Sequence, residues 1–570
     1  MNERNKKMAK WMEIRKGADF QAIGERFHIT PFTARLIRNK DITGDKEIWE
    51  YLHGGPADLH PASLMKGIPE AVALLLEKIR KKAFIRIIGD YDIDGVCATY
   101  ILLKGLEEAG ARVDTDIPDR KKDGYGLNLD LIRRAKEAGV DTIVTCDNGI
   151  AAPSEIAAAR EMGMTVIVTD HHELQDTVPR ADVIVNPRQP DCPYPYKKLC
   201  GAAVAWKLVK ELWSRLSYPE EPIFGDLLMF AAFATVGDVM DLTGENRILV
   251  KEGLGQLRRT SHPGMSALIE ANELSRERLG AYHIGFVLGP CINASGRLDT
   301  AKRALELLNT EDSALALQRA KELKELNDER KALTEEGVQM AVEQIEGSSW
   351  KEDRVLVVYL PDCHESLAGI IAGRIRERYY RPVFVLTKGE EAVKGSGRSI
   401  EAYSMFEEMS KCRELFLKYG GHPMAAGLSL PEERVDEFRR RLNESCTLTG
   451  ADLTEVIRID MVLPFSQVSE KLIEELALLE PFGKGNTKPV FAARNVTVLE
   501  SRVLGKNQNV LRMKLRDGSG AVQEGIYFNS CMQEVLDDLQ KKPTVHMLYY
   551  PEIDEFRGQR RLKLRVVNYC

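Results

Sequence analysis

Acidic and imidazole side chains follow several short apolar runs of this sequence, at the places where buried strands would end. The run "TVIVT" (165–169) leads directly into one acid and two adjacent histidines. A polar loop that caps a core strand would account for this stretch alone, but the same pattern recurs at other runs. The residues concerned are Asp90, Asp92 and Asp94 in "IIGDYDIDG", Asp147 in "CDNG", and Asp170, His171 and His172 in "TDHH". A further acid, Asp238 in "VGDVM", follows an apolar stretch that is predicted to be a helix.

Carboxylates gathered at one edge of a sheet repel one another unless a cation holds them together. Alternate side chains of an extended chain share a face, so Asp92 and Asp94 are expected to point into the same site. Carboxylate oxygens mixed with imidazole nitrogens suit Mn²⁺ or Mg²⁺ better than a metal that prefers thiolates. The number of candidate ligands favours two ions over one. For Asp90 or Asp170 taken singly, a loop or helix N-cap role is the simpler interpretation.

The elements that must position these residues alternate between strands and helices. Strands are predicted at "FIRIIGD" (84–90), "DTIVTCDNG" (141–149), "TVIVTDHH" (165–172) and "ADVIVNP" (181–187), with helical stretches between the first three. This alternation predicts βαβ units and a parallel sheet. The fixed handedness of such units places the carboxyl ends of the strands, where ligands bind, on one edge.

The rest of the chain falls into regions that differ in their predicted helices and strands. The stretch 311–345 is amphipathic, and as one helix it would be roughly 50 Å long. A second α/β lobe is predicted around "DRVLVVYL" and "RPVFVLTK", and many short strands after position 450 indicate a small barrel or sandwich. The predicted domains are an N-terminal helical segment (1–75), a catalytic domain (76–255), a helical connector that includes the long helix (256–345), a second α/β domain (346–445) and the C-terminal barrel (446–570).

Composition excludes several classes of protein. The chain has 570 residues, of which 44% are hydrophobic and 29% charged, as in ordinary globular proteins of several domains. Its most apolar run, "LLMFAAFATVGDVM" (227–240), is too short to span a bilayer and carries an acid. Ten cysteines without a CxxC pair argue against a disulfide framework or a zinc ribbon, and favour a cytoplasmic location. The net charge of -6 argues against a uniformly basic nucleic-acid binder, but permits a local basic groove.

The motifs "GDYDIDG", "CDNG" and "DHH", in this order and spacing, resemble those of the DHH phosphoesterase superfamily. Four later motifs narrow the resemblance to the RecJ family of bacterial single-strand-specific exonucleases, over nearly the whole chain. The resemblance implies an α/β fold in which a DHH-type parallel sheet domain is joined by a long helix to a second α/β lobe of the DHHA1 type, followed by a C-terminal β-barrel of the OB-fold type. The later motifs are "GPCINASGRLDTA" (289–301), "GSGRS" (395–399), "GGHPMAAG" (420–427) and "LEPFGKGNTKPVF" (479–491).

The resemblance also implies a role for each residue at the strand ends. Asp92 and Asp94 are expected to bind different metal ions, and Asp147 to bridge the two. His171 is expected to ligate one ion, whereas His172 is expected to face the phosphate. The remaining expectations are that Asp238 completes the shell of the second ion, with Gly237 before it where relatives often have Ala, and that Asp90 and Asp170 orient the ligands.

Positive donors are needed on the side of the phosphate that faces away from the metals. Arg297 in "NASGR" and His422 in "GGHPMAAG" are the candidates, although His422 could also be a structural residue in a tight glycine turn. The resemblance further implies a pocket for a terminal 5′ phosphate built from Arg120, Ser396 and Arg398. A guanidinium with a hydroxyl suits a dianionic phosphate. The alternative for Arg120 is a solvated loop cation.

Basic residues in the predicted barrel indicate DNA binding. Arg512, Lys514 and Arg516 alternate along one strand, so they would present one charged face that can track a phosphate backbone. An ordinary solvated sheet face is the alternative. Tyr527 and Phe528 would either stack bases or belong to the core. The second basic cluster comprises Arg557, Arg560 and Arg561.

The predicted function is that of a metal-dependent 5′→3′ exonuclease, which hydrolyses single-stranded DNA to 5′-mononucleotides in DNA repair and recombination. Polarity and preference for DNA rest on the resemblance alone. One alternative is a DHH-family phosphodiesterase of short oligonucleotides or cyclic dinucleotides, which would need neither barrel nor long helix. Another is a non-catalytic replication scaffold, which would have lost metal ligands. A helicase and a single-stranded-DNA-binding protein are candidate partners, and neither a membrane nor a further C-terminal domain is expected.

Overall fold

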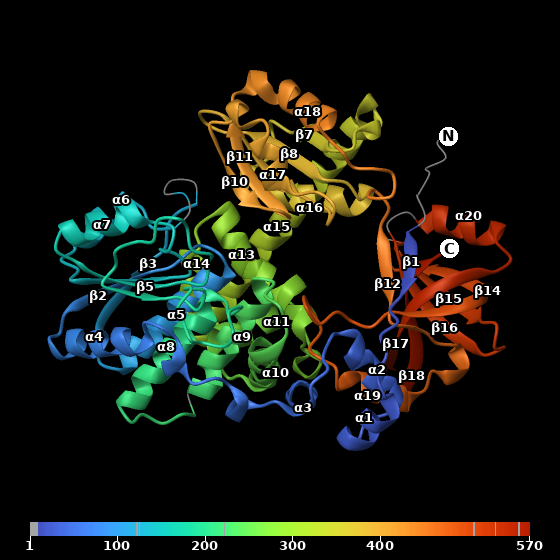
Figure 1. The fold of residues 1–570 in the computed structure, drawn as a ribbon, viewed down its shortest axis with the longest axis horizontal. Coiled ribbons are helices and arrows are strands. Elements are labelled where there is room, and N and C mark those ends of the chain that lie inside the picture. The colour runs from blue at the N-terminus through green and yellow to red at the C-terminus, as the bar shows by residue number, and fades with distance from the viewer. Residues whose placement is uncertain are drawn as a thin grey trace. The chain divides into compact units, whose positions relative to one another are not determined.

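The chain forms two compact units in the computed structural model, which describes residues 9–120, 124, 126–221, 223–505, 508–529, 532–556 and 559–570. The larger unit comprises 55–449 and 483–485 (Figure 1). The smaller unit combines 9–54 with 450–482 and 486–570. The first part of the chain therefore folds with the C-terminal part. The stretch 55–75, assigned from sequence to an N-terminal segment, belongs to the larger unit.

The larger unit is built around a sheet of five strands in the order β3-β2-β4-β5-β6. All neighbouring pairs are parallel, so the predicted parallel sheet is confirmed. The edge strand β3 was not predicted, because its sequence "RVDTD" has no continuous apolar run. The strands are β2 (Phe84–Ile88), β3 (Arg112–Asp116), β4 (Thr142–Cys146), β5 (Thr165–Thr169) and β6 (Val183–Val185).

Helices cover both faces of this sheet, because each connection between parallel strands crosses one of its faces. Ile87 and Val144 contact the core on the face of α4, α5 and α8. Ile88 and Ile143 point to the opposite face, where α6 and α7 lie. All five residues of the central strand β4 are buried. The helices are α4 (Ile68–Arg80), α5 (Ile93–Glu108), α6 (Leu129–Glu137), α7 (Pro153–Glu161) and α8 (Gly201–Arg215).

A helical region extends this core and ends in one long helix. The predicted long helix is confirmed as α15, which has 34 residues and begins after Asp312, whose side chain accepts hydrogen bonds from Ala314 N and Leu315 N. No helix among the described residues is long and apolar enough to cross a membrane. The helices are α9 (Leu228–Gly237), α10 (Gly244–Arg259), α11 (Pro263–Ala271), α12 (Ala281–His283), the π-helical turn η5 (Ile284–Leu288), α13 (Gly289–Leu298), α14 (Lys302–Asn309) and α15 (Ser313–Glu346).

A second sheet of the larger unit has the order β10-β11-β9-β8-β7. β7 and β8 are parallel and α16 connects them, as predicted, whereas the other pairs are antiparallel. The "GSGRS" and "GGHPMAAG" motifs lie on β9 and on the β10–β11 hairpin, which were not predicted because glycine is depleted in strands. The elements are β7 (Leu356–Tyr359), η7 (Glu365–Leu367), α16 (Ala368–Tyr379), β8 (Val383–Lys388), β9 (Val393–Arg398), α17 (Met405–Ser410), β10 (Lys418–His422), β11 (Ala425–Leu430) and α18 (Val435–Glu444).

The smaller unit contains a closed barrel of five strands, which confirms the predicted OB-type barrel. Its sheet runs β14-β15-β16-β18-β17, and the pairing of β17 with β14 closes the ring. The helix α20, between β16 and β17, was not predicted. The barrel elements are β13 (Met461–Val462), α19 (Glu470–Ala477), β14 (Phe491–Leu504), β15 (Val510–Arg516), β16 (Val522–Phe528), α20 (Met532–Lys541), β17 (Val545–Phe556) and β18 (Gln559–Tyr569).

N-terminal elements complete the smaller unit. Leu36, Ile37 and Ile48 share one apolar core with Phe491 and Met547 of the barrel. A short strand β1 pairs in parallel with β12. These contacts join segments more than 400 residues apart, which explains why the sequence pattern alone did not place them. The elements are β1 (Lys10–Glu13), α1 (Phe20–Phe27), α2 (Pro31–Asn39), α3 (Asp45–His53) and β12 (Val456–Ile459).

Candidate two-metal active site

The strand ends of the parallel sheet, together with the C-terminal end of α9, bring the predicted acids and histidines into one cluster. Among the described residues, three groups of side chains place their ligand atoms within 4.8 Å of one another. Asp147 and His171 each belong to two of these groups, and Asp147 is the member that links the group of Asp90 and Asp92 to His171. The groups are Asp90, Asp92 and Asp147; Asp94, His171 and Asp238; and Asp147, His171 and His172.

The loop after β2 is held by two helix N-termini. Asp92 is the N-cap of α5, and its Oδ1 accepts hydrogen bonds from Asp94 N and Gly95 N. Asp94 in turn accepts from the first N–H groups of α8: Gly201 N and Ala202 N each lie 2.7 Å from one of its oxygens. Position 201 must be glycine, because a Cβ there would lie 2.7 Å from Cβ of Asp147. Unpaired N–H groups at helix starts attract negatively polarised oxygens, so these hydrogen bonds hold both side chains in place.

Asp147 follows β4 in a left-handed backbone conformation, with φ of 60°. Aspartate tolerates this region better than most residues. Its Oδ1 lies 3.0 Å from Nε2 of His171, yet forms no hydrogen bond with any described residue. Oδ1 of Asp90 is buried in the same way without a partner. Since buried polar atoms are normally satisfied, two orphaned carboxylate oxygens in one cluster indicate positions where a cation fits.

Asp170 fixes the two histidines in different roles. Its oxygens accept backbone hydrogen bonds from Ile150, His171 and His172. His171 directs Nε2 at Asp94, Asp147 and Asp238, at distances of 3.5, 3.0 and 3.9 Å. His172 instead places Nδ1 2.8 Å from Asp170 Oδ1. Burial opposes a charge on His172, but the hydrogen bond and the charge of Asp170 outweigh it and raise the pKa of His172 to about 9.

Burial raises the pKa of three acids of the cluster, and a bound cation would oppose this rise. Burial, reinforced by Asp92, raises the pKa of Asp90 to about 8. Burial, reinforced by Asp94, likewise raises the pKa of Asp238 to about 8. The pKa of Asp147 lies well above its ordinary value for the same reasons. Carboxylate oxygens with one neutral imidazole form a hard donor set, so these residues fit two divalent cations of the Mn²⁺ or Mg²⁺ type.

Arg297 and Arg120 lie beside this cluster. Burial, together with the charge of Arg120, lowers the pKa of Arg297 to about 10, so Arg297 stays cationic at neutral pH. Its Nη1 donates to Ser366 O at 2.8 Å, in the second lobe. The guanidinium of Arg120 lies over the ring of Tyr91, 5.1 Å from its centroid. Both arginines therefore flank the loop that carries the first motif.

Asn293 has a positioning role that the sequence interpretation missed. Its Oδ1 accepts a hydrogen bond of 2.8 Å from Ile93 N, between two of the metal-binding candidates. The residue stands within the quoted motif "GPCINASGRLDTA", so the signal was present. What the sequence did not reveal is that α13 packs against the loop after β2.

Ser396 and Arg398 come together on β9, opposite the first turn of α16. A Cβ on Gly369 would lie 2.8 Å from Arg398 Nη2 and 3.5 Å from Ser396 Oγ, so both side chains face this glycine. Burial, with the charge of Arg376, lowers the pKa of Arg398. A guanidinium and a hydroxyl at a helix start can bind an anion. His422 is exposed at the end of β10, beside a two-residue turn.

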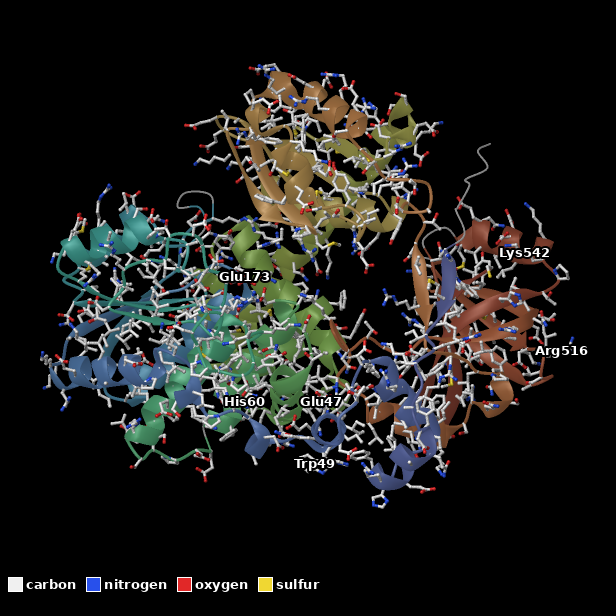
Figure 2. All side chains as sticks on the ribbon, viewed as in Figure 1. Glu47, Trp49, His60, Glu173, Arg516 and Lys542 are labelled. Carbon is white, nitrogen blue, oxygen red and sulfur yellow. The ribbon has the colours of Figure 1, made fainter. Side chains whose placement is uncertain are left out.

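The basic residues predicted on the barrel are exposed but partly neutralised. Arg512, Lys514 and Arg516 alternate with buried residues along β15, and Figure 2 labels Arg516 on the outside of the smaller unit. Arg512 pairs with Glu524 at 2.6 Å and Lys514 with Glu500 at 3.3 Å.

The second basic cluster and the two aromatic candidates also lie in the smaller unit. Arg560 lies 3.6 Å from both Glu470 and Glu474. Arg561 is exposed, whereas Arg557 lies outside the described residues. Tyr527 is buried in the barrel core, and Phe528 is exposed with the guanidinium of Arg565 3.8 Å from its ring centroid.

Comparison with known proteins identifies the family. Three family models match the chain: the DHH family N-terminal domain over 84–235, the DHHA1 domain over 352–447 and the RecJ OB domain over 459–568. The chain is 34% identical over 558 residues to the single-stranded-DNA-specific exonuclease RecJ of Salmonella typhimurium, covering 94% of this chain and 95% of that protein. The chain belongs to the RecJ family.

Two further RecJ proteins are similar to the chain over most of its length. RecJ of Bacillus subtilis is 38% identical over 520 residues, which cover 89% of this chain and 65% of that longer protein. The crystal structure of RecJ from Thermus thermophilus in complex with Mn²⁺ matches with a TM-score of 0.84 and 29% identity, covering 99% of this chain and 80% of that one. The RecJ fold is therefore present from the catalytic sheet through to the barrel.

Proposed function

We propose that this RecJ-family chain is a 5′→3′ exonuclease that hydrolyses single-stranded DNA to 5′-mononucleotides, with two divalent cations, Mn²⁺ or Mg²⁺, in its site. The observation that carries the proposal is the position of Asp147, whose carboxylate is shared between an acidic group and a group with His171. One carboxylate between two sets of ligands is the arrangement that holds two cations a few ångströms apart. The RecJ names of the relatives and the Mn²⁺ complex of the Thermus protein support this assignment.

The ligands divide between the two cations. Asp92 would hold one ion and Asp94 the other, and Asp147 would be shared between them. His171 and Asp238 stand with Asp94 and complete the ligands of the second ion. Asp90, expected to orient ligands, stands within reach of Asp92 and Asp147 and is a candidate ligand as well. When bound, two such ions supply a hydroxide at neutral pH and stabilise charge on the attacking and leaving oxygens of an in-line displacement.

The chain's own cations act on the phosphate. His172 is held by Asp170 and is protonated at neutral pH, so it donates a hydrogen bond to a phosphate oxygen rather than binding a metal. Arg297 supplies a second positive donor beside the first motif, and His422 a third from the second lobe. Phosphodiester hydrolysis needs little more than such positioning and charge stabilisation.

Strand polarity follows from recognition of one end. Ser396 and Arg398, which face the start of α16, bind the terminal 5′ phosphate, and Arg120 contributes to the same recognition. A pocket that holds the 5′ end next to the site of hydrolysis would release one nucleotide at a time. The basic residues of the barrel bind the strand beyond this point.

The cellular role follows from the substrate. The enzyme acts in the cytoplasm, in DNA repair and recombination, on single strands that a helicase exposes and a single-stranded-DNA-binding protein covers. The five proposed metal ligands are all present, which argues against a scaffold that has lost its activity. The barrel argues against a phosphodiesterase of very short substrates.

The degradation of end-labelled single strands tests the proposal. A long single strand carrying a 5′ label, and the same strand with a 3′ label, are incubated with Mn²⁺ beside a matched duplex. Immediate release of labelled mononucleotide from the 5′ label, with a shortening ladder from the 3′ label, is expected. Cleavage of di- to tetranucleotides without attack on the long strand would instead assign the chain to the small-nucleotide phosphodiesterases.

A further inference from the structure

Two aromatic side chains of the larger unit are about two-thirds exposed to solvent. Tyr282 is 66% exposed and Phe286 is 69% exposed, the highest values of any large apolar side chain among the described residues. Their ring centroids are 5.1 Å apart and the rings are stacked, with an interplanar angle of 25°. Contiguous exposed apolar surface can mark a binding surface, because leaving it in water is unfavourable.

The backbone beneath these rings is firmly anchored. The rings flank the start of the π-helical turn η5, where Ile284 and Leu288 are buried in the core. Gly285 faces α9, since a Cβ there would lie 3.8 Å from Val236 Cγ1. π-Helical turns are rare and occur frequently at functional sites. The turn thus fixes its apolar side on α9 and presents the aromatic pair outward on a rigid base.

The aromatic pair belongs to elements that also build the metal cluster. The helix α9, on which η5 packs, ends at Asp238. The helical stretch that contains Tyr282 continues into α13, where Asn293 accepts the hydrogen bond from Ile93 N and Arg297 reaches the second lobe. Tyr282 and Asn293 are separated by about 16 Å of helix, a distance that roughly three to five nucleotides of a strand would span.

Arginines lie in and next to the segment that leads into the pair. Arg258 Nε donates to Leu279 O at 2.9 Å, three residues before Tyr282. Arg276 is held nearby through a hydrogen bond of 2.7 Å from Nη1 to Thr260 O. Arg258 and Arg259 at the end of α10 and Arg278 before the pair are exposed, as are the acids Glu273 and Glu277. Cations beside stacked aromatic rings are the combination with which proteins hold unpaired strands, through phosphates and bases respectively.

We propose that Tyr282 and Phe286 form a stacking platform for unpaired bases, located a few nucleotides from the phosphodiester that is cut. This inference rests on the proposed function, because the platform has a role only if the substrate is a single strand. Bases in a duplex are already stacked on their neighbours and cannot lie on the rings. The platform therefore favours single strands over duplexes and links strand binding to the metal cluster.

The test compares long and short substrates. Affinities are measured without hydrolysis, with Ca²⁺ in place of Mn²⁺, for a 5′-phosphorylated strand of about 20 nucleotides and for a 5′-phosphorylated dinucleotide, which is too short to reach the rings. Tyr282→Ala or Phe286→Ala should reduce the ratio of long-strand to dinucleotide affinity about 5- to 30-fold. Tyr282→Phe and Phe286→Tyr, which keep the stacked rings, should restore it. Leu417→Ala is the matched control, because Leu417 is an apolar side chain of 63% exposure on the second lobe.

Strands that each lack one base, at successive positions, give a measurement that a purely structural role of the two rings would not affect. Removing single bases along the strand should weaken wild-type binding at one or two positions, a few nucleotides from the 5′ end. The same removals should have no effect in the Tyr282→Ala Phe286→Ala variant, which has no ring left for the missing base to contact. Equal abasic profiles in both proteins, or equal losses in the Leu417→Ala control, would overturn the platform. A wild-type protein that degrades no single strand would instead reject the proposed function itself.

Discussion

Nδ1 of His172 lies 2.8 Å from Oδ1 of Asp170, while the neighbouring His171 turns its Nε2 toward Asp147 at 3.0 Å. Two adjacent histidines at the end of one strand thus point to different partners. One imidazole stays neutral and available to a metal, since burial lowers the pKa of His171. The other is held as a cation by its acid. In the "DHH" sequence, Asp170 therefore holds the backbone of both histidines and pairs with the side chain of His172 alone.

Asp170→Asn should lower the pKa of His172, which Asp170 holds at about 9 against the effect of burial. Protonated His172 is the proposed donor to the phosphate, so activity declines as the pH rises through this pKa. Without the charge of Asp170, the decline should start at lower pH, with roughly 100-fold loss near pH 8 and a smaller loss near pH 6. The measurement is the pH profile of kcat for wild type and variant. A uniform loss across the whole pH range would contradict the assignment.

Asp147→Ala should abolish hydrolysis by removing the carboxylate shared between the two ion sites. Loss of at least about 1000-fold in kcat is expected, with binding of single-stranded DNA largely retained. Asp141→Ala is a matched control, because Asp141 directly precedes the same strand β4 and pairs with Lys78 on the surface. Turnover at the wild-type rate in Asp147→Ala would exclude the two-ion assignment.

The protein stripped of metal should lose stability as the pH rises. The pKa values of Asp90 and Asp238 are raised to about 8 in the folded state, well above those of the unfolded chain. Between about pH 4 and pH 8 the folded state therefore binds more protons than the unfolded state, and the free energy of unfolding falls with increasing pH.

Thermal unfolding in EDTA and in Mn²⁺ checks this expectation. In EDTA the Tm should fall between about pH 5 and pH 8. Mn²⁺ should remove or reverse the trend, since it favours the ionised carboxylates. Asp238→Asn should flatten the profile in EDTA. A Tm in EDTA that rises over this range would show that the acids are already ionised in the folded protein without metal.

Part of the site could be predicted from the sequence because strands of a parallel sheet are continuous apolar runs. "TIVTC" is buried along its whole length, and the acid that follows it must lie at the carboxyl edge. The alternation of strands and helices then gathered Asp92, Asp147 and His171 at that edge. Those residue types could be assigned to metal binding on chemical grounds alone.

The remaining features depend on contacts between distant segments. Asp94 is fixed by the N–H of Gly201, which is 107 residues away, and no local pattern reveals that pairing. The strand β9 and the β10–β11 hairpin are rich in glycine, so their pairing comes from the sheet and not from local preference. The packing of Leu36 on the barrel likewise depends on the tertiary structure.

Arg398→Ala should weaken recognition of the 5′ end. Substrates with a 5′ phosphate should lose about 10-fold or more in kcat/KM, because a charge-assisted hydrogen bond is removed. The same strands with a 5′ hydroxyl should be affected much less. Arg378→Ala is the matched control, since Arg378 is an exposed arginine near the end of α16. Equal losses on both substrates would remove Arg398 from the end-binding pocket.

Neutralising the acids of the barrel face should tighten binding to single-stranded DNA. Glu524 pairs with Arg512 and Glu500 with Lys514, so these acids compete with phosphates for the same cations. Glu500→Gln Glu524→Gln should therefore increase affinity severalfold at low salt and steepen the dependence of affinity on salt concentration. Glu25→Gln serves as the control, because Glu25 is exposed on α1 of the same unit. Arg516→Ala should weaken binding and reduce the slope of log affinity against log salt concentration by about one. If the salt dependence is the same in all four proteins, this face of β15 does not contact the strand.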